Sequence, residues 1–214
     1  MLPSFVPHVL REPDYITPPI RPLPAVRCVG LDRSETDEGM SDVVFERLNG
    51  AQTMGEFDQI QEVYVAAFPD YSLADHRMRT ERQAASPGFE TVTARVDGVL
   101  VGFAYGLPLS ARSTWWEGLE PAAGEDFVAE TGSRTFAVID LAVLPAHRGR
   151  GLGRRLMAEL LGGRSEERAT LATNPNKRAL QEMYERWGWR KAGRVPGGEG
   201  ETQPVFDLYV IDLR

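Results

Sequence analysis

Three glycines alternate with other residues in one short segment, and their spacing suits the binding of an anion. Gly149, Gly151 and Gly153 have no Cβ, so the backbone there can take left-handed conformations and approach a ligand closely. A helix expected to begin near Gly151 would direct unpaired N–H groups and the positive end of its dipole at the same place. The segment also carries four guanidinium groups, in Arg148, Arg150, Arg154 and Arg155. Together these features predict a phosphate-binding loop.

Two common nucleotide-binding loops do not fit this segment. A nucleotide P-loop needs Lys and then Ser or Thr directly after its second glycine, but Arg154 and Arg155 follow Gly153. A dinucleotide-binding fingerprint needs a glycine three positions after its middle glycine, and those positions here hold Arg154 or Leu156. The alternative without a ligand is a glycine-rich turn with solvated arginines.

Two separate segments resemble the GNAT superfamily of N-acyltransferases. The segment Arg148-Gly-Arg-Gly-Leu-Gly153, after Leu141-Ala-Val-Leu-Pro145, is similar to the acetyl-CoA signature of that family. That signature reads Arg or Gln, two residues, Gly, one residue, then Gly or Ala. The later segment Tyr184-Glu-Arg-Trp-Gly-Trp189 is similar to the family's Tyr-x-x-x-Gly-aromatic segment. The order of expected elements extends the resemblance from about Asp42 to Arg214.

The resemblance implies where acetyl-CoA would bind as a co-substrate. In the family, two central parallel strands splay apart, and the pantetheine arm pairs with the strand groups left free. Here that role would fall to Leu141, Ala142 and Val143, and an N–H near Val143 would hold the oxyanion of the thioester. Backbone amides of the loop would hold the CoA pyrophosphate, from Arg148, Gly149, Arg150, Gly151, Leu152, Gly153 and Arg154.

The resemblance also places Tyr184 beside the CoA sulfur, where its hydroxyl would hydrogen-bond the developing thiolate and pass on its proton late. The alternative is a core aromatic residue whose hydroxyl is satisfied by the protein. Two residues depart from the family pattern, which has Asn seven positions and Ala four positions before the tyrosine: Asn176, and Leu180 in the alanine position. Here Asn176 lies eight positions before Tyr184, a difference of about 100° on a helix, unless Asn176 lies in the preceding loop. Asn176 remains a candidate contact for CoA.

Asp140 interrupts the apolar segment Ala137-Val-Ile-Asp-Leu-Ala-Val143, where an unpaired carboxylate would be costly. Burial would raise its pKa from about 3.9 toward neutrality, which suits a general base or a partner for a substrate ammonium. The alternative is a structural carboxylate that accepts from backbone donors or pairs with an arginine. Glu130 and Glu90 are weaker candidates for the base, and a water chain is a further one.

Hydrophobic periodicity indicates the elements that must position these groups. Helices are expected over 54–68 and over 176–187, and a third from about 151. A capping box formed by Ser72 and Asp75 indicates a further short helix. An irregular insert is expected at 110–133, and Asp97-Gly98 indicates a tight hairpin. This order predicts one α/β domain with a mixed sheet covered by helices. The GNAT resemblance makes the sheet mostly antiparallel, with a central, splayed parallel pair and helices on both faces. The expected strands are 43–48, 91–96, 99–109, 134–144, 169–173, 189–194 and 205–212.

The first 41 residues differ from the domain expected at 42–214. Seven of the fifteen prolines lie between Pro3 and Pro24, which favours a polyproline-like or disordered leader. A second interpretation is that Met40 is the true start and that residues 1–39 are not native. The N-terminus does not have the pattern of a secretory signal, and no apolar run approaches the ~18 residues of a membrane span. We therefore expect a cytoplasmic protein that does not act at a membrane.

Composition narrows the class of function further. The chain has 24 Lys and Arg against 31 Asp and Glu, a net charge of -7, which argues against nucleic acid as a partner. One cysteine, Cys28, excludes an internal disulfide, and the three histidines do not have metal-ligand spacing, so no metal is expected. Cys28 lies in the leader, so no catalytic cysteine is evident, which favours direct attack over a covalent acyl-enzyme.

These observations predict an N-acetyltransferase that moves an acetyl group from acetyl-CoA to a primary amine in a ternary complex. The alternative is a non-catalytic acyl-CoA-binding or regulatory module. The acceptor is an amine of a small molecule or of a protein, and the acidic chain weakly favours a cationic one. Trp115 and Trp116 could line the acceptor side, or belong to the core or to a homodimer surface.

Overall fold

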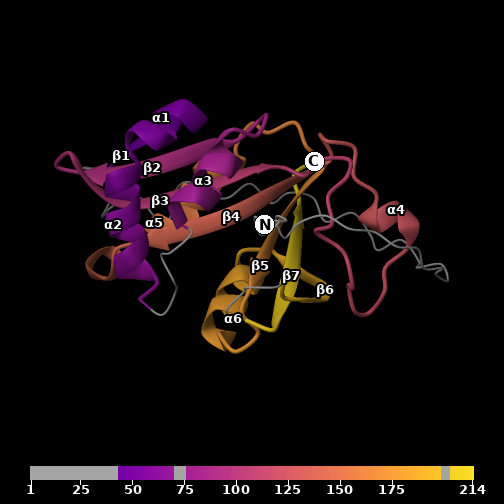
Figure 1. The fold of residues 1–214 in the computed structure, drawn as a ribbon. Helices are drawn as coiled ribbons and strands as arrows, with labels where there is room; N and C mark the ends of the chain where they lie inside the picture. The colour runs from indigo at the N-terminus through magenta and orange to yellow at the C-terminus, as the bar shows by residue number, and fades with distance from the viewer. Residues whose placement is uncertain (1–42, 70–75, 199–202) are drawn as a thin grey trace, which may run out of the picture.

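A computed structural model describes residues 43–69, 76–198 and 203–214. These residues form a seven-stranded sheet in the order β1-β2-β3-β4-β5-β7-β6 (Figure 1). All neighbouring strands are antiparallel except β4 and β5, which are parallel. This confirms the predicted mixed sheet with a central parallel pair. The strands are β1 (Val43–Leu48), β2 (Glu90–Val96), β3 (Val99–Pro108), β4 (Thr135–Val143), β5 (Arg168–Thr173), β6 (Arg190–Pro196) and β7 (Val205–Asp212).

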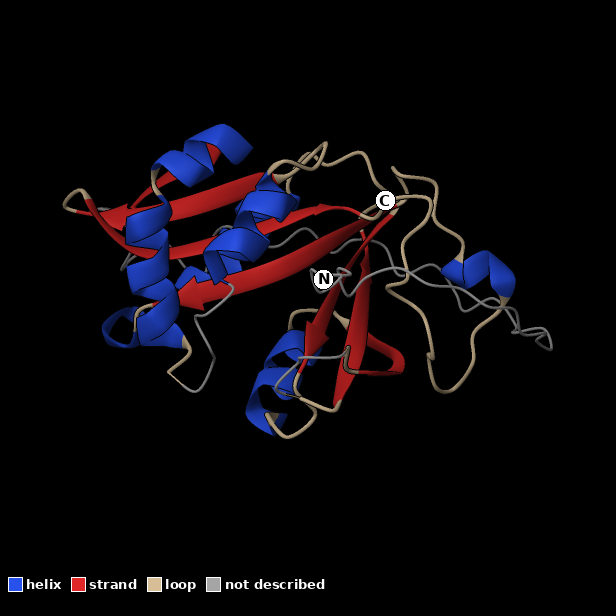
Figure 2. Ribbon diagram, viewed as in Figure 1, coloured by secondary structure: helices blue, strands red, loops and turns tan. Residues whose placement is uncertain are grey.

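Helices cover both faces of the sheet, as predicted (Figure 2). Ile60 and Val63 of α2 bury their side chains against Phe103 on one face. Leu156 and Leu160 of α5 pack against the other face. Each apolar stripe repeats at helical spacing, so each helix contributes one buried side and one solvated side. The described helices are α1 (Gly50–Gly55), α2 (Phe57–Ala67), α3 (His76–Ala84), α4 (Glu125–Val128), α5 (Leu152–Leu161) and α6 (Arg178–Arg186).

The predicted single helix over 54–68 is wrong, because two helices, α1 and α2, meet there at Glu56. The missed signal is a capping box that begins α1: the Asn49 side chain accepts from the Gln52 amide, and the Gln52 side chain accepts from the Asn49 amide. The expected hairpin is confirmed, with Asp97 and Gly98 both at positive φ. The capping box expected at Ser72 and Asp75 lies outside the described residues, and α3 is described from His76.

The insert over 110–133 packs onto the half of the sheet formed by β4, β5, β6 and β7. Trp116 and Leu119 are buried there against Val195 and Leu208, and the insert contains the short helix α4. The Trp115 indole donates to the Thr170 hydroxyl at 3.1 Å. Trp116 therefore takes the core role among the alternatives that the sequence left open, whereas Trp115 is half-buried and packs against the same cluster.

The leader at 1–41, with Cys28 and Met40, lies outside the described residues. Within the described ranges, no helix combines the length and the apolar character needed to cross a membrane.

Candidate active site

The sheet divides between its two parallel strands. β4 and β5 pair only over Thr135–Val138 and Arg168–Leu171, and beyond Val138 the two strands diverge (Figure 1). On its other edge, β4 stays paired with β3 as far as Val143. The unpaired length of β4 contains the predicted pantetheine contacts, Leu141, Ala142 and Val143. The Val143 carbonyl in this length accepts from the Arg148 guanidinium, and the pairing of these residues with a ligand stays a prediction.

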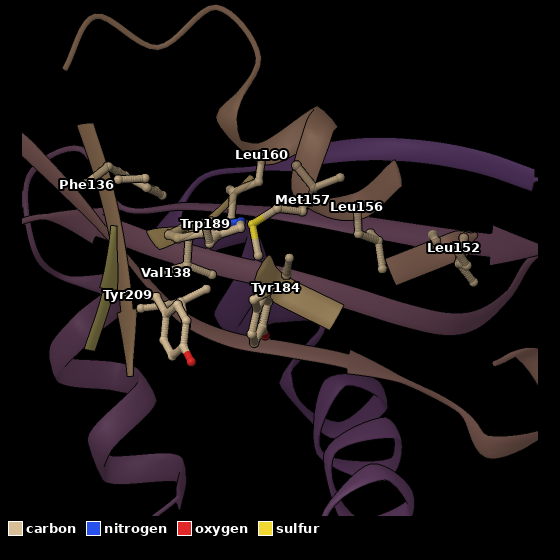
Figure 3. Close-up of a cluster of buried hydrophobic side chains, with 14 of the residues drawn as sticks. Phe136, Val138, Leu152, Leu156, Met157, Leu160, Tyr184, Trp189 and Tyr209 are labelled. Carbon is tan, nitrogen blue, oxygen red and sulfur yellow. The ribbon is translucent and has the colours of Figure 1, made fainter. Parts of the chain in front are cut away.

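Large aromatic side chains pack together beside the point where β4 and β5 begin to diverge. Tyr184 and Trp189 are buried in one apolar cluster with Val138, the last residue of β4 that pairs with β5 (Figure 3). The Tyr184 ring lies edge-on to Trp187, with 5.7 Å between the ring centroids. These rings come from α6 and the residues just after it, so α6 is anchored beside the division.

The glycine loop leaves consecutive backbone donors unpaired. β4 is followed by a 3-10 turn (Pro145–His147), and then Gly149 and Gly151 adopt φ values of 77° and 80°. The amides of residues 149–154 have no acceptor among the described residues, and the Arg155 amide is the next, bonding Gly151 O at 3.0 Å. A row of free amides at the start of α5 is the arrangement that binds phosphate.

The four arginines of the loop differ in their availability. Arg150 and Arg154 have no ion pair or hydrogen bond within the described parts of the chain. Arg155 pairs with Glu159 at 2.8 Å on its own helix. Two guanidinium groups therefore remain available to an anion at the loop.

Arg148 has a different position from the one predicted. Its amide donates to Pro145 O at 3.3 Å, so that amide is not among the free donors. Its side chain donates to Val143 O at 3.0 Å and to Ala67 O at 3.2 Å. Arg148 thus ties the end of β4 to the end of α2, and we assign the free amides of the loop to residues 149–154.

Asp140 lies in the unpaired length of β4, beside an extra residue, Ile139, that shifts the register with β3. Its side chain is partly exposed, although protein atoms crowd it on most sides. Burial raises the pKa of Asp140, while a hydrogen bond from Tyr105 and the charge of Arg79 oppose that rise. The raised pKa suits a carboxylate that accepts a proton near neutral pH.

Tyr184 lies on α6, close enough to Asp140 for the two groups to interact electrostatically. Burial, and then the charge of Asp140, raise the pKa of Tyr184 well above its ordinary value, so it stays a neutral phenol. No described residue forms a hydrogen bond with its hydroxyl, which is not among the buried polar atoms without a partner and is therefore accessible to water or a ligand. The catalytic role of Tyr184 stays a prediction.

The structure does not bring the weaker base candidates to this site. The buried Glu130 carboxylate pairs with Arg168 at 3.0 Å and also accepts from Trp116 and Thr135. Glu90 accepts from the Arg47 guanidinium. Both carboxylates therefore have structural partners in this fold.

Asn176 lies in the turn before α6, exposed, and its amide donates to the Asn174 side chain at 2.8 Å. The sequence allowed for a position of Asn176 in this loop. Because Asn176 does not lie on the helix, the one-residue difference in spacing does not rotate it relative to Tyr184. Its contact with CoA stays a prediction.

Two residues near the site were missed in the sequence. Tyr105 on β3 donates its hydroxyl to Asp140 at 2.5 Å, and Arg79 on α3 acts on the same carboxylate. The only signal for Tyr105 was its inclusion in a long apolar strand, which does not reveal the residue opposite. Arg79 lies on a helix whose packing depends on tertiary structure.

Residues 57–189 match the Acetyltransferase (GNAT) family. A GCN5-like protein acetyltransferase of Mycobacterium tuberculosis is 32% identical over 99 residues, 42% of this chain and 48% of that protein. The match thus spans about half of that relative's length.

Solved structures share the fold at low sequence identity. Arabidopsis thaliana NAA60 in complex with acetyl-CoA has a TM-score of 0.55 and 17% identity, covering 79% of this chain and 98% of that one. An aminoglycoside 6'-acetyltransferase type Ii has a TM-score of 0.57 and 16% identity, covering 80% and 97%.

A mixed sheet that divides at its parallel pair, with a row of free amides beside the division, is the fold of an acetyltransferase. The family match covers more than half of the chain. The protein therefore belongs to the GNAT family of acetyltransferases.

Proposed function

We propose that this protein is an N-acetyltransferase that transfers the acetyl group of acetyl-CoA to a primary amine by direct attack in a ternary complex. Three features carry the proposal: the free amides of residues 149–154, the edge of β4 that is not paired with β5, and the electrostatic interaction of Asp140 with Tyr184. The alternative, a non-catalytic acyl-CoA-binding module, would need only the first two.

The residues present fit acetyl-CoA. The amides of 149–154 would hold the pyrophosphate, with Arg150 and Arg154 supplying charge. Leu141, Ala142 and Val143 would pair with the pantetheine arm as a neighbouring strand does. When bound, acetyl-CoA supplies an activated acyl carbon. An amide near Val143 would stabilise the negative charge on its carbonyl oxygen.

The proposed chemistry moves two protons. Asp140 takes the first from the acceptor ammonium, which leaves a neutral amine and a neutral carboxyl group, and later releases it to solvent. The amine nitrogen forms its bond to the acyl carbon as the carbon–sulfur bond breaks. Tyr184 gives its proton to the departing sulfur and regains one from the nitrogen, so the products are an amide and a thiol.

The pKa directions of the two groups affect these roles differently. A raised pKa at Asp140 makes the carboxylate a stronger base than a solvated aspartate. A raised pKa keeps Tyr184 a neutral hydrogen-bond donor, but it also makes the phenol a weaker acid than the thiol that it would protonate. Tyr184 therefore acts mainly as a hydrogen-bond donor to the developing thiolate, and it passes on its proton only as it regains one from the amine nitrogen.

The acceptor is proposed to be a cationic primary amine, because the chain carries a net charge of -7 and Asp140 is available to pair with an ammonium. The named relatives include a protein acetyltransferase and an aminoglycoside acetyltransferase, so both protein and small-molecule amines belong in the test. Cytoplasmic location, the absence of membrane and nucleic-acid partners, and a homodimer are further predictions from the sequence.

The test combines binding with turnover. Titration calorimetry with acetyl-CoA should give a heat of association, and a panel of amines should include at least one that releases free thiol. Heat of association without thiol release from any protein or small-molecule amine would favour the non-catalytic module. No heat at all would overturn both interpretations.

A further inference from the structure

Tyr105 and Asp140 are direct partners across the β3–β4 ladder. The register pairs Tyr105 with Asp140 and Gly106 with Val138, which leaves Ile139 as an extra residue on β4. Such an extra residue re-aims the side chains beside it. Here the result is a hydrogen bond of 2.5 Å from the Tyr105 hydroxyl to Oδ2 of Asp140.

The surroundings of the Tyr105 ring hold it in place. Tyr105 is fully buried, lies nearly parallel to the Phe103 ring with 5.8 Å between centroids, and contacts Phe89 at 5.4 Å. Moving the hydroxyl away from Asp140 would therefore require repacking of this aromatic group. The donor is preorganised before any ligand binds.

The two carboxylate oxygens of Asp140 therefore differ in their hydrogen-bond partners. Oδ2 is occupied by Tyr105, whereas no described residue donates to Oδ1. The residue as a whole is half-buried. One oxygen is thus held by the protein and the other is left for a ligand.

Titratable and charged groups face Asp140 from three elements. Tyr105 approaches from β3, Arg79 from α3 and Tyr184 from α6. Tyr105 and Arg79 favour the ionised carboxylate, and burial opposes them. Among these groups, Tyr105 is the one whose hydrogen bond to the carboxylate is seen directly.

We propose that Tyr105 is a positioning residue for the acetyl-transfer site, holding Oδ2 of Asp140 so that Oδ1 alone receives the proton of the incoming amine. The inference rests on the proposed function, since it assigns Tyr105 a role only through Asp140. It predicts that loss of one buried hydroxyl, which is not itself assigned a contact with CoA, changes the pH dependence of the reaction.

The experiment compares Tyr105→Phe with the wild-type protein. The variant keeps the aromatic packing and removes only the donor, so the pKa of Asp140 should rise by about one unit. This rise is measured by titrating the ¹³C-labelled Asp140 carboxyl by NMR, assigned by its loss in Asp140→Asn. The acid limb of kcat/KM for an active amine should move upward by the same amount, with the Kd for acetyl-CoA unchanged.

Tyr209→Phe is the matched control. Tyr209 is equally buried and donates to a different carboxylate, Glu185, at 3.1 Å. Removal of its hydroxyl should leave both the Asp140 titration and the acid limb unmoved. If Tyr105→Phe does not fold, 3-fluorotyrosine at position 105, a stronger donor, should lower the pKa of Asp140 instead.

The outcomes separate the two proposals. An unmoved Asp140 titration in the position-105 variants would overturn the positioning role. If the Asp140 titration moves but the acid limb of kcat/KM does not, the positioning role of Tyr105 in the reaction is overturned. If Asp140→Asn keeps the wild-type acid limb, the base assigned under the proposed function is wrong, whatever the NMR titration shows.

Discussion

Asp140 on β4 and Tyr184 on α6 lie close enough to interact electrostatically, and burial and then the charge of Asp140 raise the pKa of Tyr184. The two residues belong to different elements, and Asp140 lies beyond Val138, where the pairing of β4 with β5 ends. We propose Asp140 as the proton acceptor and Tyr184 as the proton donor of the reaction. This relationship sets the first two predictions.

Replacing Tyr184 by Phe should lower kcat by about 100-fold, because the leaving sulfur loses its proton donor. The Kd for acetyl-CoA should change less than twofold, since the pyrophosphate donors lie elsewhere. Steady-state kinetics and calorimetry on the same preparation make the comparison. An unchanged kcat would return Tyr184 to a purely structural role in the core.

Replacing Asp140 by Asn should lower kcat/KM by about 100-fold at neutral pH and remove the acid limb of the pH profile. The same replacement should not lower stability. The folded state raises the pKa of Asp140, so at pH values above the ordinary pKa of aspartate it binds more protons than the unfolded state. The free energy of unfolding therefore falls as pH rises. The variant should therefore melt at or above the wild-type Tm at pH 8. A lower Tm at pH 8 would contradict this account of the buried charge.

Gly149 and Gly163 form a matched pair for testing the loop. Both are exposed glycines with φ near +76°, at 77° and 75°, and an added Cβ would meet nothing within 4 Å at either position. Alanine at either should cost about 1 kcal/mol of folding free energy through the left-handed backbone.

Only Gly149→Ala should weaken the binding of acetyl-CoA, by about 10-fold or more. Gly149 lies in the row of free amides, whereas Gly163 follows the far end of α5. Calorimetry and urea unfolding of both variants make the comparison. Equal affinities in the two variants would refute the phosphate assignment.

His76 makes stability depend on pH away from the site. It is fully buried, stacked on Tyr64 with 3.9 Å between centroids, and neither ring nitrogen has a partner among the described residues. Burial, and then the charge of Arg79, lower the pKa of His76 to about 4. The imidazole is therefore neutral in the folded protein.

The unfolded state binds the extra proton below pH ~6.5, so this group should remove up to about 3 kcal/mol of stability as pH falls from 6.5 to 4. His76→Phe should flatten that loss, as measured by urea unfolding at several pH values. A variant curve that runs parallel to the wild-type curve would show that His76 does not titrate this way.

Much of the fold was predictable from local patterns. The Asp97-Gly98 hairpin follows from two adjacent residues that tolerate positive φ, and the α5 stripe follows from leucines at helical spacing. The boundary between α1 and α2 was missed because a continuous apolar stripe hid the capping signal at Asn49.

The sequence by itself determined the GNAT resemblance, the position of the glycine loop and the anomaly of Asp140, because each depends on residue types at short spacing. Only the tertiary structure decided that Arg148 ties β4 to α2, that Glu130 belongs to a buried ion pair, and that Tyr105 holds Asp140. These three relationships join elements that are distant in the chain. Strand register and helix packing select such partners through the burial of whole faces, and a local pattern carries no record of that selection.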